Sequence, residues 1–210
     1  MPEIVTDRLR LRPFEHADLP AFVAYRSHHD VARFQSWDTT YSLADAKAFL
    51  ASQEDLVLGA PGEWVQLAVL GRRGGEPCGD CAVRVVDYQP ATAEVRITFA
   101  PEHQGSGLAT EALTSVISAL FELHELHSVF AQADDRNLAV QRLLERLGLR
   151  CEARLIEADW FKGVWTTLRT YATLRREWRH DPRGQMTVAF SRSTCDSRKR
   201  HQALHAAERR

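Results

Sequence analysis

Two glycines stand directly before a helical pattern, in the run Gln104-Gly105-Ser106-Gly107-Leu108-Ala109. Glycine at such positions lets successive backbone N–H groups point into one concavity, and the dipole of the following helix adds positive potential there. A loop of this kind can hold a phosphate or pyrophosphate group, although glycines before a helix also occur as simple turns. The run therefore predicts an anion site at residues 104–109.

Two nucleotide-binding motifs are excluded by the residues around this loop. A P-loop requires a Lys-Ser/Thr pair after its last glycine, whereas Gly107 is followed by Leu108 and Ala109. The dinucleotide motif requires a third glycine where this chain has Thr110. The pattern before the loop is that of antiparallel strands rather than of repeated β-α-β units, so neither nucleotide fold is expected.

Cysteine and histidine spacing does not indicate a metal site. Of the four cysteines, Cys78 and Cys81 form one C-x-x-C pair that enters a strand-like segment, while Cys151 and Cys195 stand alone. A zinc site would need a second pair, or histidines at matching spacing. We therefore expect no metal, and interpret the cysteines as small thiols of a reducing compartment.

The loop lies within a pattern of strands and helices that must position it. Alternating or β-branched apolar runs predict strands, and apolar residues at helical spacing predict helices. Strands are expected at residues 9–13, 65–70, 81–86, 92–100, 128–133, 154–160 and 165–174. Helices are expected near 21–25 and 46–50, the second behind a Ser42/Asp45 capping box, and at 108–121 and 138–147. The fold class is α/β (α+β), with a single mixed sheet of about six to seven strands and about four helices.

Length and composition favour one domain followed by a distinct C-terminal segment. The 210 residues are 44% apolar and 26% charged, which suits one globular core and excludes wholesale disorder. No apolar run reaches the roughly 20 residues that cross a bilayer, and the start lacks the order of a secretory signal, so a cytoplasmic location is expected. After Trp178, eight Lys/Arg accompany three Asp/Glu, which leaves residues 1–178 with a net charge of −6 against an overall −1. We predict a domain over 1–178 and a basic, flexible tail over 179–210.

The run from Gln104 to Ala109 matches the acyl-CoA signature R/Q-x-x-G-x-G/A position for position, and the chain resembles the GCN5-related N-acetyltransferase (GNAT) superfamily. Within the superfamily it is most similar to the ribosomal-protein alanine acetyltransferase (RimJ/RimL-like) branch. Four further stretches carry this similarity, at 6–12, 110–112, 137–148 and 177–178. The resemblance covers residues 5–178 and does not extend to the tail.

The resemblance implies a strongly bent sheet in which two parallel strands, 94–100 and 128–133, splay apart to admit the pantetheine arm of CoA. The donor would be acetyl-CoA, with the pyrophosphate held by N–H groups from Gly105 to Thr110. Asn137 would contact the cofactor from the other side, and it also stands where a plain helix N-cap would. The expected cofactor-binding residues are Ile97, Thr98, Phe99, Gln104, Gly105, Ser106, Gly107, Leu108, Ala109, Thr110 and Asn137.

Acetyl transfer needs a neutral amine, stabilisation of the oxyanion and a proton for the thiolate. The resemblance makes Glu94 the candidate catalytic base, acting through water, although an exposed glutamate at a strand end accounts for it equally well. A strand N–H near Phe99 would polarise the thioester carbonyl. Relatives carry Tyr or Ser for the thiolate where this chain has Leu144 and Val140. A donor such as Tyr25, Tyr41 or water, an unassisted thiolate, and a different reaction all stay open.

Aromatic residues offer walls for an acceptor pocket. Trp37, Tyr41, Trp160 and Trp165 are the substrate-binding candidates, although aromatic residues in a sheet are more often core or dimer contacts. The acidic charge of residues 1–178 suits an amine-bearing substrate, and it is also typical of an ordinary solvated surface.

Three functional hypotheses follow. The first is an N-acetyltransferase that moves an acetyl group from acetyl-CoA to a primary amine, on a protein N-terminus or a small molecule. The second is acyl or aminoacyl transfer from another donor such as an aminoacyl-tRNA, suggested by the missing Ser and Tyr and by the basic clusters at 198–200 and 209–210. The third is a CoA-binding module without turnover. A homodimer stays open as an expectation, and no membrane partner is expected.

Overall fold

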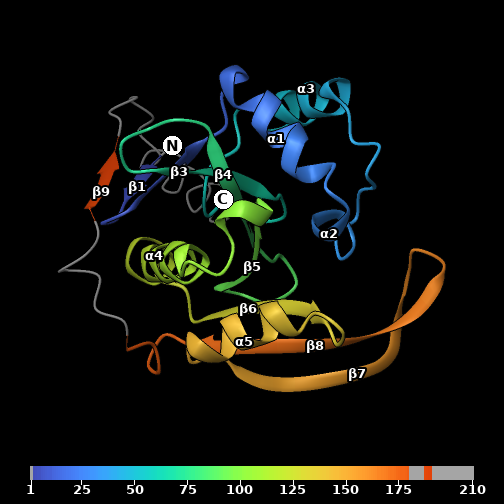
Figure 1. The fold of residues 1–210 in the computed structure, drawn as a ribbon. Helices are drawn as coiled ribbons and strands as arrows, with labels where there is room; N and C mark the ends of the chain where they lie inside the picture. Colours follow the sequence, from blue (N-terminus) through green and yellow to red (C-terminus); the bar gives the residue numbers. More distant parts are fainter. Residues whose placement is uncertain (1, 180–186, 191–210) are drawn as a thin grey trace, which may run out of the picture.

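The computed structural model describes residues 2–179 and 187–190, the side chains of Pro2 and of residues 187–190 excepted. In this part of the chain, one mixed sheet has the strand order β7-β8-β6-β5-β4-β3-β2-β1-β9 (Figure 1). The strands are β1 (Pro2–Val5), β2 (Leu9–Pro13), β3 (Val65–Gly71), β4 (Pro77–Val85), β5 (Thr92–Phe99), β6 (Ser128–Asp134), β7 (Arg150–Phe161), β8 (Val164–Leu174) and β9 (Thr187–Phe190). The α-helices are α1 (Leu19–Arg26), α2 (His29–Ala32), α3 (Leu43–Ser52), α4 (Leu108–Leu123) and α5 (Leu138–Arg146), with 3-10 turns at His16–Asp18 and Pro101–His103.

Most of the predicted elements are confirmed, because their signals are local. β2 ends at Pro13 and α5 ends before Gly148, which has a φ of 80°. The capping box at the start of α3 is also present. The Ser42 hydroxyl accepts a hydrogen bond from the Asp45 N–H at 3.2 Å, and the Asp45 carboxylate accepts one from the Ser42 N–H at 2.8 Å.

The described sheet has nine strands, which is more than the predicted six to seven, and there are five α-helices rather than four. The additional strands β1 and β9 are four residues long, too short to show a clear alternation. They pair antiparallel with each other, with Glu3 opposite Ala189. β9 lies within the segment predicted as a tail, and residues 180–186 and 191–210 of that segment lie outside the described residues.

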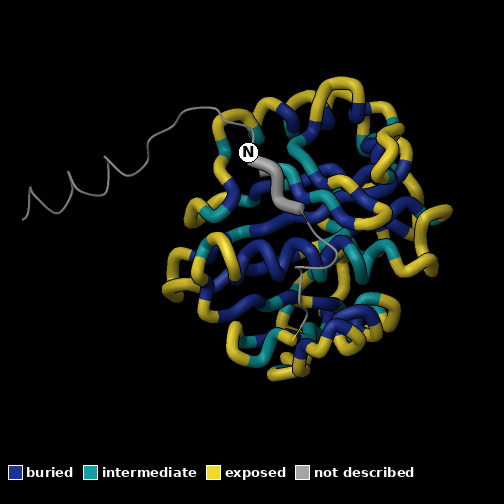
Figure 2. The backbone as a smooth tube through the Cα atoms, turned by 90° about the vertical axis from the view of Figure 1, so that its left-hand side faces the viewer, coloured by how far each residue is buried: buried dark blue, intermediate teal, exposed yellow. Residues whose placement is uncertain are grey.

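The helices cover the sheet in two groups. α4 packs on β2 and β5, and α5 packs on β6 and β7, while α1 packs on β4 and α3 at the other end of the molecule (Figure 1). One apolar cluster joins α4 to the central strands, and a second, rich in aromatic residues, lies under α1 and α3. Figure 2 shows buried residues along α4 and the inner strands, with exposed residues at the turns. No helix of the described residues is long and apolar enough to cross a membrane.

β5 and β6 are parallel neighbours that separate part of the way along. Their pairing begins at Thr92 opposite Ser128 and stops at Glu94 opposite Phe130. Both strands continue beyond this point, β5 alongside β4 and β6 alongside β8. The predicted splay between these two strands is therefore confirmed, and it leaves one edge of β5 without a strand partner.

Candidate active site

The open edge of β5 presents unpaired backbone groups toward the splay. The carbonyl of Thr92 and the N–H of Ala100 both form hydrogen bonds on the β4 side of the strand. Because backbone groups alternate between the two sides of a strand, those of Val95, Ile97 and Phe99 face away from β4. The pairing of Glu94 with Phe130 uses the Val95 N–H, and the Phe99 carbonyl accepts from the Gln104 side chain. The groups left open are the Val95 carbonyl, both groups of Ile97 and the Phe99 N–H. An extended ligand lying in the splay can pair with these groups as an added strand would.

Thr98 differs from its neighbours in what it presents. By the same alternation, its backbone groups face β4, where Asp80 lies opposite. Its hydroxyl accepts a hydrogen bond from the Gln35 side chain at 3.3 Å, and both residues line the groove beside the splay. The Thr98 side chain therefore joins the segment after α2 to β5. Of the three predicted residues, Ile97 and Phe99 present backbone groups to the splay, whereas Thr98 presents its hydroxyl to Gln35.

The glycine loop ends at the open edge of β5, and its conformation requires glycine. Gly105 and Gly107 have φ values of 73° and 80°, in the left-handed region that other residues adopt at a cost. Gly107 is the N-cap of α4. Among the described residues, the backbone N–H groups of residues 105–110 have no hydrogen-bond partner. Six free donors at the positive end of a 16-residue helix have the hydrogen-bonding capacity and the polarity that suit an anion.

Arg8 holds this loop from outside. Its guanidinium donates to a carboxylate oxygen of Glu111 at 2.6 Å and to the carbonyl oxygen of Ser106 at 3.0 Å, and its backbone N–H donates to the other oxygen of Glu111 at 2.9 Å. The Thr6 hydroxyl also donates to Glu111, at 2.5 Å. Burial raises the pKa of Glu111, but the hydrogen bonds from Thr6 and Arg8 outweigh it and leave the pKa below its ordinary value. The carboxylate is therefore charged, and the loop is braced on both flanks.

A groove of about 650 Å³ runs from this loop along the open edge of β5. Gln104 borders it and donates its side-chain N–H to the carbonyl of Phe99 at 2.9 Å. Asn137 borders it from the opposite side, and its side chain accepts from the Val140 N–H at 3.3 Å, so the expected N-cap of α5 is present. Every predicted cofactor-binding residue except Ser106 lines this groove.

Two arginines of this groove are not among the predicted cofactor-binding residues. Arg142 and Arg146 lie four residues apart on α5, are exposed, and line the groove together with His103. Their spacing places both on one face of a helix, and that signal was available in the sequence. Two cations here suit a further anionic group on the ligand that the loop binds.

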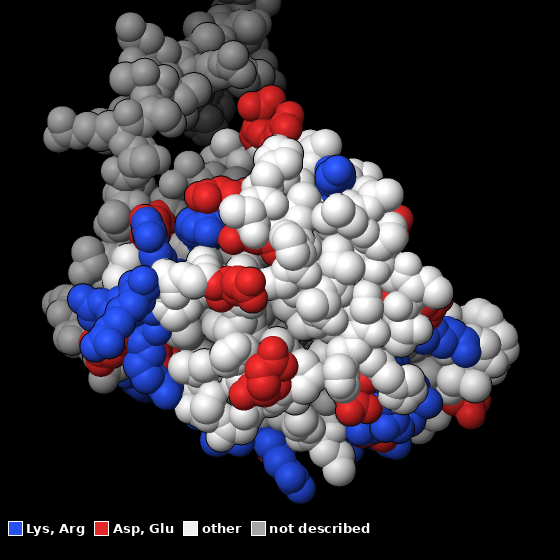
Figure 3. Space-filling view, turned by 45° about the horizontal axis from the view of Figure 1, so that its top comes forward, with Lys and Arg blue, Asp and Glu red and all other residues white. Residues whose placement is uncertain are grey.

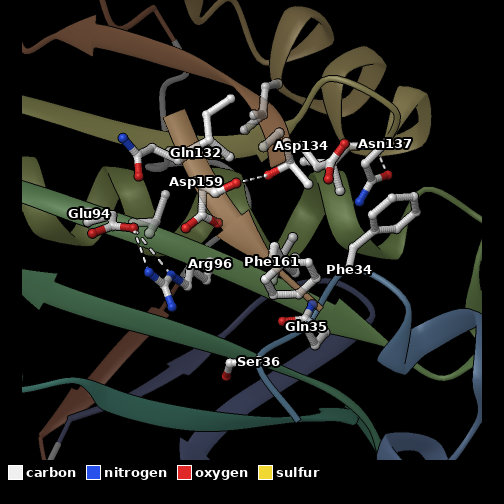
Figure 4. Close-up of a pocket in the computed structure, with 18 of the residues that line it drawn as sticks. Phe34, Gln35, Ser36, Glu94, Arg96, Gln132, Asp134, Asn137, Asp159 and Phe161 are labelled. Carbon is white, nitrogen blue, oxygen red and sulfur yellow. Dashed lines mark hydrogen bonds and ion pairs between the residues drawn. The ribbon is translucent and has the colours of Figure 1, made fainter. Parts of the chain in front are cut away.

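A second cavity, of about 310 Å³, continues from the groove (Figure 4). The two spaces share Phe34, Gln35, Ile97, Asn137 and Val140 as lining residues, so a molecule in the second cavity meets the end of a ligand in the groove. Val140 and Leu144 line it with apolar side chains. Neither can donate a proton to a group that leaves from this junction.

Glu94 borders the second cavity but is buried and paired. One carboxylate oxygen accepts from Arg84 at 2.7 Å and the other from Arg96 at 3.0 Å, and the side chain is 3% exposed. Arg84 is its neighbour across the β4–β5 pair, and Arg96 follows on the same face of β5. The alternative expectation of an exposed glutamate is therefore wrong. The role of Glu94 as a base stays a prediction, and it concerns a carboxylate that is paired with two arginines.

Asp159 and Phe161 also line the second cavity, and sequence reasoning did not single out Asp159. They lie near the end of β7, where two extra residues between Leu155 and Asp159 interrupt the pairing with β8. Such bulges bend a hairpin and re-aim its side chains. Figure 1 shows the tip of the β7–β8 hairpin curving toward α2, and Figure 4 shows Asp159 and Phe161 beside the cavity.

Lys162, in the turn between β7 and β8, fixes that hairpin to the segment after α2. Its ammonium group donates to the carbonyl oxygens of Ala32 at 2.9 Å and Trp37 at 2.7 Å, and it pairs with Asp38 at 3.0 Å. The wall containing Phe161 is thereby joined to the wall containing Phe34. The second cavity consequently has a closed side built from two segments that are far apart in the sequence.

Trp37 and Tyr41 do not line either cavity. They surround a buried cation of the protein itself, the guanidinium of Arg26, whose central carbon lies 3.7 Å from the centre of the Trp37 ring and 5.1 Å from that of Tyr41. The rings of Phe22 and Phe49 complete this enclosure. The space between these rings is occupied by an arginine side chain, so Trp37 and Tyr41 make the core contacts that were the alternative expectation.

Trp160 and Trp165 are exposed at the hairpin tip, at 59% and 60%. They face each other across the strand pair with ring centres 5.3 Å apart, and they are absent from the lining of both cavities. Side chains alternate along a strand, so Trp160 points outward because its neighbours Asp159 and Phe161 point inward. The substrate-binding role of these four aromatic residues stays a prediction that the cavity lining does not support.

The proposed proton donors other than water are also remote from the cavities. The Tyr25 hydroxyl is buried and donates to Asp80 at 2.6 Å, and burial raises the pKa of Tyr25 well above its ordinary value. Tyr41 lies in the Arg26 enclosure. Cys78 and Cys81 are buried free thiols, and burial raises the pKa of Cys78 to about 11. No group of metal-binding residues occurs in the described part of the chain.

One face of the molecule carries charged groups of both signs. On the face drawn in Figure 3, acidic groups are scattered over the centre and basic groups gather toward the edges.

Comparisons with known proteins were made for the whole chain. A family model described as "Acetyltransferase (GNAT) domain" matches residues 8–150. The chain is 24% identical over 178 residues to the uncharacterized N-acetyltransferase p20 of Bacillus licheniformis, covering 85% of this chain and 99% of that protein. It is 26% identical over 93 residues to the spermidine N(1)-acetyltransferase of Vibrio cholerae, covering 44% of this chain and 54% of that protein. A crystal structure of spermidine N-acetyltransferase from Vibrio cholerae in complex with CoA and spermine has a similar fold, with a TM-score of 0.69, 20% identity, and coverage of 81% and 97% of the two chains.

Proposed function

Because the chain belongs to the acetyltransferase (GNAT) domain family and is an acyltransferase, we propose that it transfers the acetyl group of acetyl-CoA to the primary amine of a small molecule. The observation that carries the proposal is the junction of two cavities beside the open edge of β5. The groove suits the donor, and the second cavity, the acceptor cavity, suits the acceptor. The reaction is a direct attack within a complex of both substrates, in the cytoplasm.

The residues of the groove fit the CoA part of the donor. The free N–H groups of residues 105–110 match a pyrophosphate in charge and hydrogen-bonding capacity. Arg142 and Arg146 would pair with the remaining phosphate group, since exposed arginines bind phosphate well. The backbone groups of Ile97 and the N–H of Phe99 would hydrogen-bond with the amides of the pantetheine arm, as a neighbouring strand does.

A backbone N–H on the same edge of β5 would polarise the carbonyl of the thioester. Ile97 presents an open N–H at the junction, because it lines both the groove and the second cavity. A fixed donor aimed at an oxygen that gains negative charge lowers the barrier without reorganisation. Much of the remaining rate would come from holding amine and thioester in line.

Protons must leave the amine and reach the departing sulfur. The amine nitrogen attacks the carbonyl carbon, the new C–N bond forms as the C–S bond breaks, and one proton from nitrogen ends on the thiolate. Val140 and Leu144 cannot carry that proton, so we assign the transfer to water. A thiol has a pKa of about 8.5 and leaves readily, so this assistance contributes little.

Calorimetric titration with acetyl-CoA and with CoA, followed by mass spectrometry of an amine panel, tests this function. Micromolar binding together with acetylated product supports it. Tight binding without product from any amine would favour a CoA-binding module instead. Absence of binding would contradict the donor assignment, and a salt-sensitive gel shift with tRNA, lost on truncation after Trp178, would then point to aminoacyl transfer.

A further inference from the structure

The second cavity contains three acidic side chains that differ in their partners. Glu94 pairs with Arg84 and Arg96. Asp134 accepts two hydrogen bonds from the Arg136 guanidinium, at 2.9 and 2.6 Å. The carboxylate of Asp159 has no hydrogen bond and no ion pair within the described residues, although the residue is half-buried and lines the cavity. Of these three carboxylates, only that of Asp159 has no cationic partner within the described residues.

The position of Asp159 is fixed by structure around it. The peptide carbonyl of Asp159 accepts from the Thr166 hydroxyl at 3.3 Å, and the two residues are opposite each other in the β7–β8 pair. The bulge before Asp159 and the Lys162 contacts after it set the direction of the hairpin tip. In Figure 4 the carboxylate lies at the cavity, on the side opposite Phe34 and Gln35.

A half-buried carboxylate without a partner is less stable than one that is paired, so a ligand that brings a positive charge gains binding energy there. The reacting amine itself is a poor partner for it. An ammonium group held against a carboxylate retains its proton, and a protonated nitrogen cannot attack a thioester. The charge that suits Asp159 is therefore a second cationic group of the acceptor.

Resting on the proposed function, we propose that Asp159 determines acceptor specificity by pairing with a positive charge other than the reacting amine. The acceptor is accordingly a small molecule with at least two amino groups. Its far end lies against Asp159 near the hairpin tip, and its reacting end lies at the junction with the groove. An acceptor with a carboxylate at the far end would be repelled by the same residue.

Three primary amines with the same four-carbon chain isolate this charge. They are butylamine, 1,4-diaminobutane and 4-aminobutanoate, which end in a methyl group, an ammonium group and a carboxylate. We expect kcat/KM to be highest for the diamine and lowest for the amino acid. In Asp159→Asn, the ratio of kcat/KM for diamine to that for butylamine should fall about tenfold, while the KM for acetyl-CoA should stay unchanged.

Glu157→Gln is the matched control, because Glu157 lies two residues away on β7, is exposed, and is absent from the cavity lining. It removes the same charge from the same hairpin and should leave the three kcat/KM values in their wild-type ratio. Asp159→Lys is a second variant, which should favour 4-aminobutanoate over the diamine.

Two results would overturn the proposal in different ways. If the wild-type protein acetylates these amines but Asp159→Asn leaves the ratios unchanged, or changes them no more than Glu157→Gln does, Asp159 has no role in specificity and the proposed function stands. If the wild-type protein binds acetyl-CoA but acetylates none of the three amines, the small-molecule acceptor falls together with the role of Asp159.

Discussion

The guanidinium of Arg8 donates to the carboxylate of Glu111 at 2.6 Å, although 103 residues separate them in the chain. The contact joins the start of β2 to the first turn of α4, and the same guanidinium holds the Ser106 carbonyl. The stretches at 6–12 and 110–112, which carry part of the resemblance to the acetyltransferases, thus meet at the loop that we assign to the pyrophosphate. Arg8 is a positioning residue for that loop.

Arg8→Gln should raise the KM for acetyl-CoA severalfold and leave kcat almost unchanged. The glycine loop loses the contacts that fix its N–H groups, whereas the contacts that form the acceptor cavity are unchanged. The free energy of unfolding should fall by less than about 1 kcal/mol, as expected for an ion pair with a half-exposed arginine. Arg10→Gln is the matched control. Arg10 pairs with Glu3 beside it and does not touch the loop. Equal KM values for the two variants would argue against the brace.

Gly107→Ala and Gly107→Val should weaken acetyl-CoA binding by about tenfold or more, since a residue with a Cβ costs about 1–2 kcal/mol in the left-handed region and shifts the donors of the loop. An added Cβ would also lie 3.5 Å from the Arg8 guanidinium. Calorimetric titration measures the effect. Gly74→Ala, in an exposed turn with a φ of 87°, carries a similar strain at a residue that does not line the groove. If Gly74→Ala weakens binding as much, the loss comes from general destabilisation.

The parts of the site that sequence predicts are those built from neighbouring residues. The glycine loop, the helix behind it and the two splayed strands have local signals in glycine positions and apolar spacing. The acceptor cavity has no such local signal. It depends on hydrogen bonds from Lys162 to the carbonyls of Ala32 and Trp37, which lie 130 and 125 residues away in the chain. Nothing in the local pattern around Lys162 distinguishes it from a solvated turn.

Two groups of candidate residues have partners within the protein itself. Trp37 and Tyr41 were expected either as walls of an acceptor pocket or as core contacts, and they pack against the core around Arg26 of the chain itself. Glu94 was expected to be either a base or an exposed residue at a strand end; it is buried and paired with two arginines, and its role as a base stays a prediction. In both cases the type of residue indicates its preferred partner, and only the three-dimensional arrangement tells whether that partner is substrate or protein.

Glu94→Gln distinguishes the two roles of that carboxylate. With both oxygens held by arginines, we expect turnover to fall by the same factor at every pH, together with a loss of about 1–3 kcal/mol in stability from unpaired charges. A loss of turnover confined to values below about pH 8, with thermal stability unchanged, would instead establish Glu94 as the base, since a more basic medium supplies neutral amine unaided.

Lys162→Met should raise the KM for the amine severalfold and leave acetyl-CoA binding unchanged. The variant keeps the length of the side chain and removes the charge that joins the hairpin to Ala32, Trp37 and Asp38. The wall of the acceptor cavity then loses its fixed position, whereas the groove keeps its own contacts. Lys47→Met, on the exposed side of α3, is the control and should behave as the wild type does. A rise in the KM for acetyl-CoA alone would contradict the assignment of the two cavities.

Asp135 should make stability depend on pH at the turn that carries Asn137. Hydrogen bonds from Arg154 and Arg169 lower the pKa of Asp135 to about 2. The same contacts tie the turn after β6 to β7 and β8. A carboxylate whose pKa is lower in the folded protein than its value of about 3.9 in the unfolded chain stabilises the fold above that value, and the contribution disappears as the pH falls toward 2. Asp135→Asn should therefore lower the midpoint of thermal unfolding near neutral pH, and its curve should meet that of the wild type near pH 2. A difference that stays constant over this range would mean that the arginines bind the asparagine as well as they bind the aspartate.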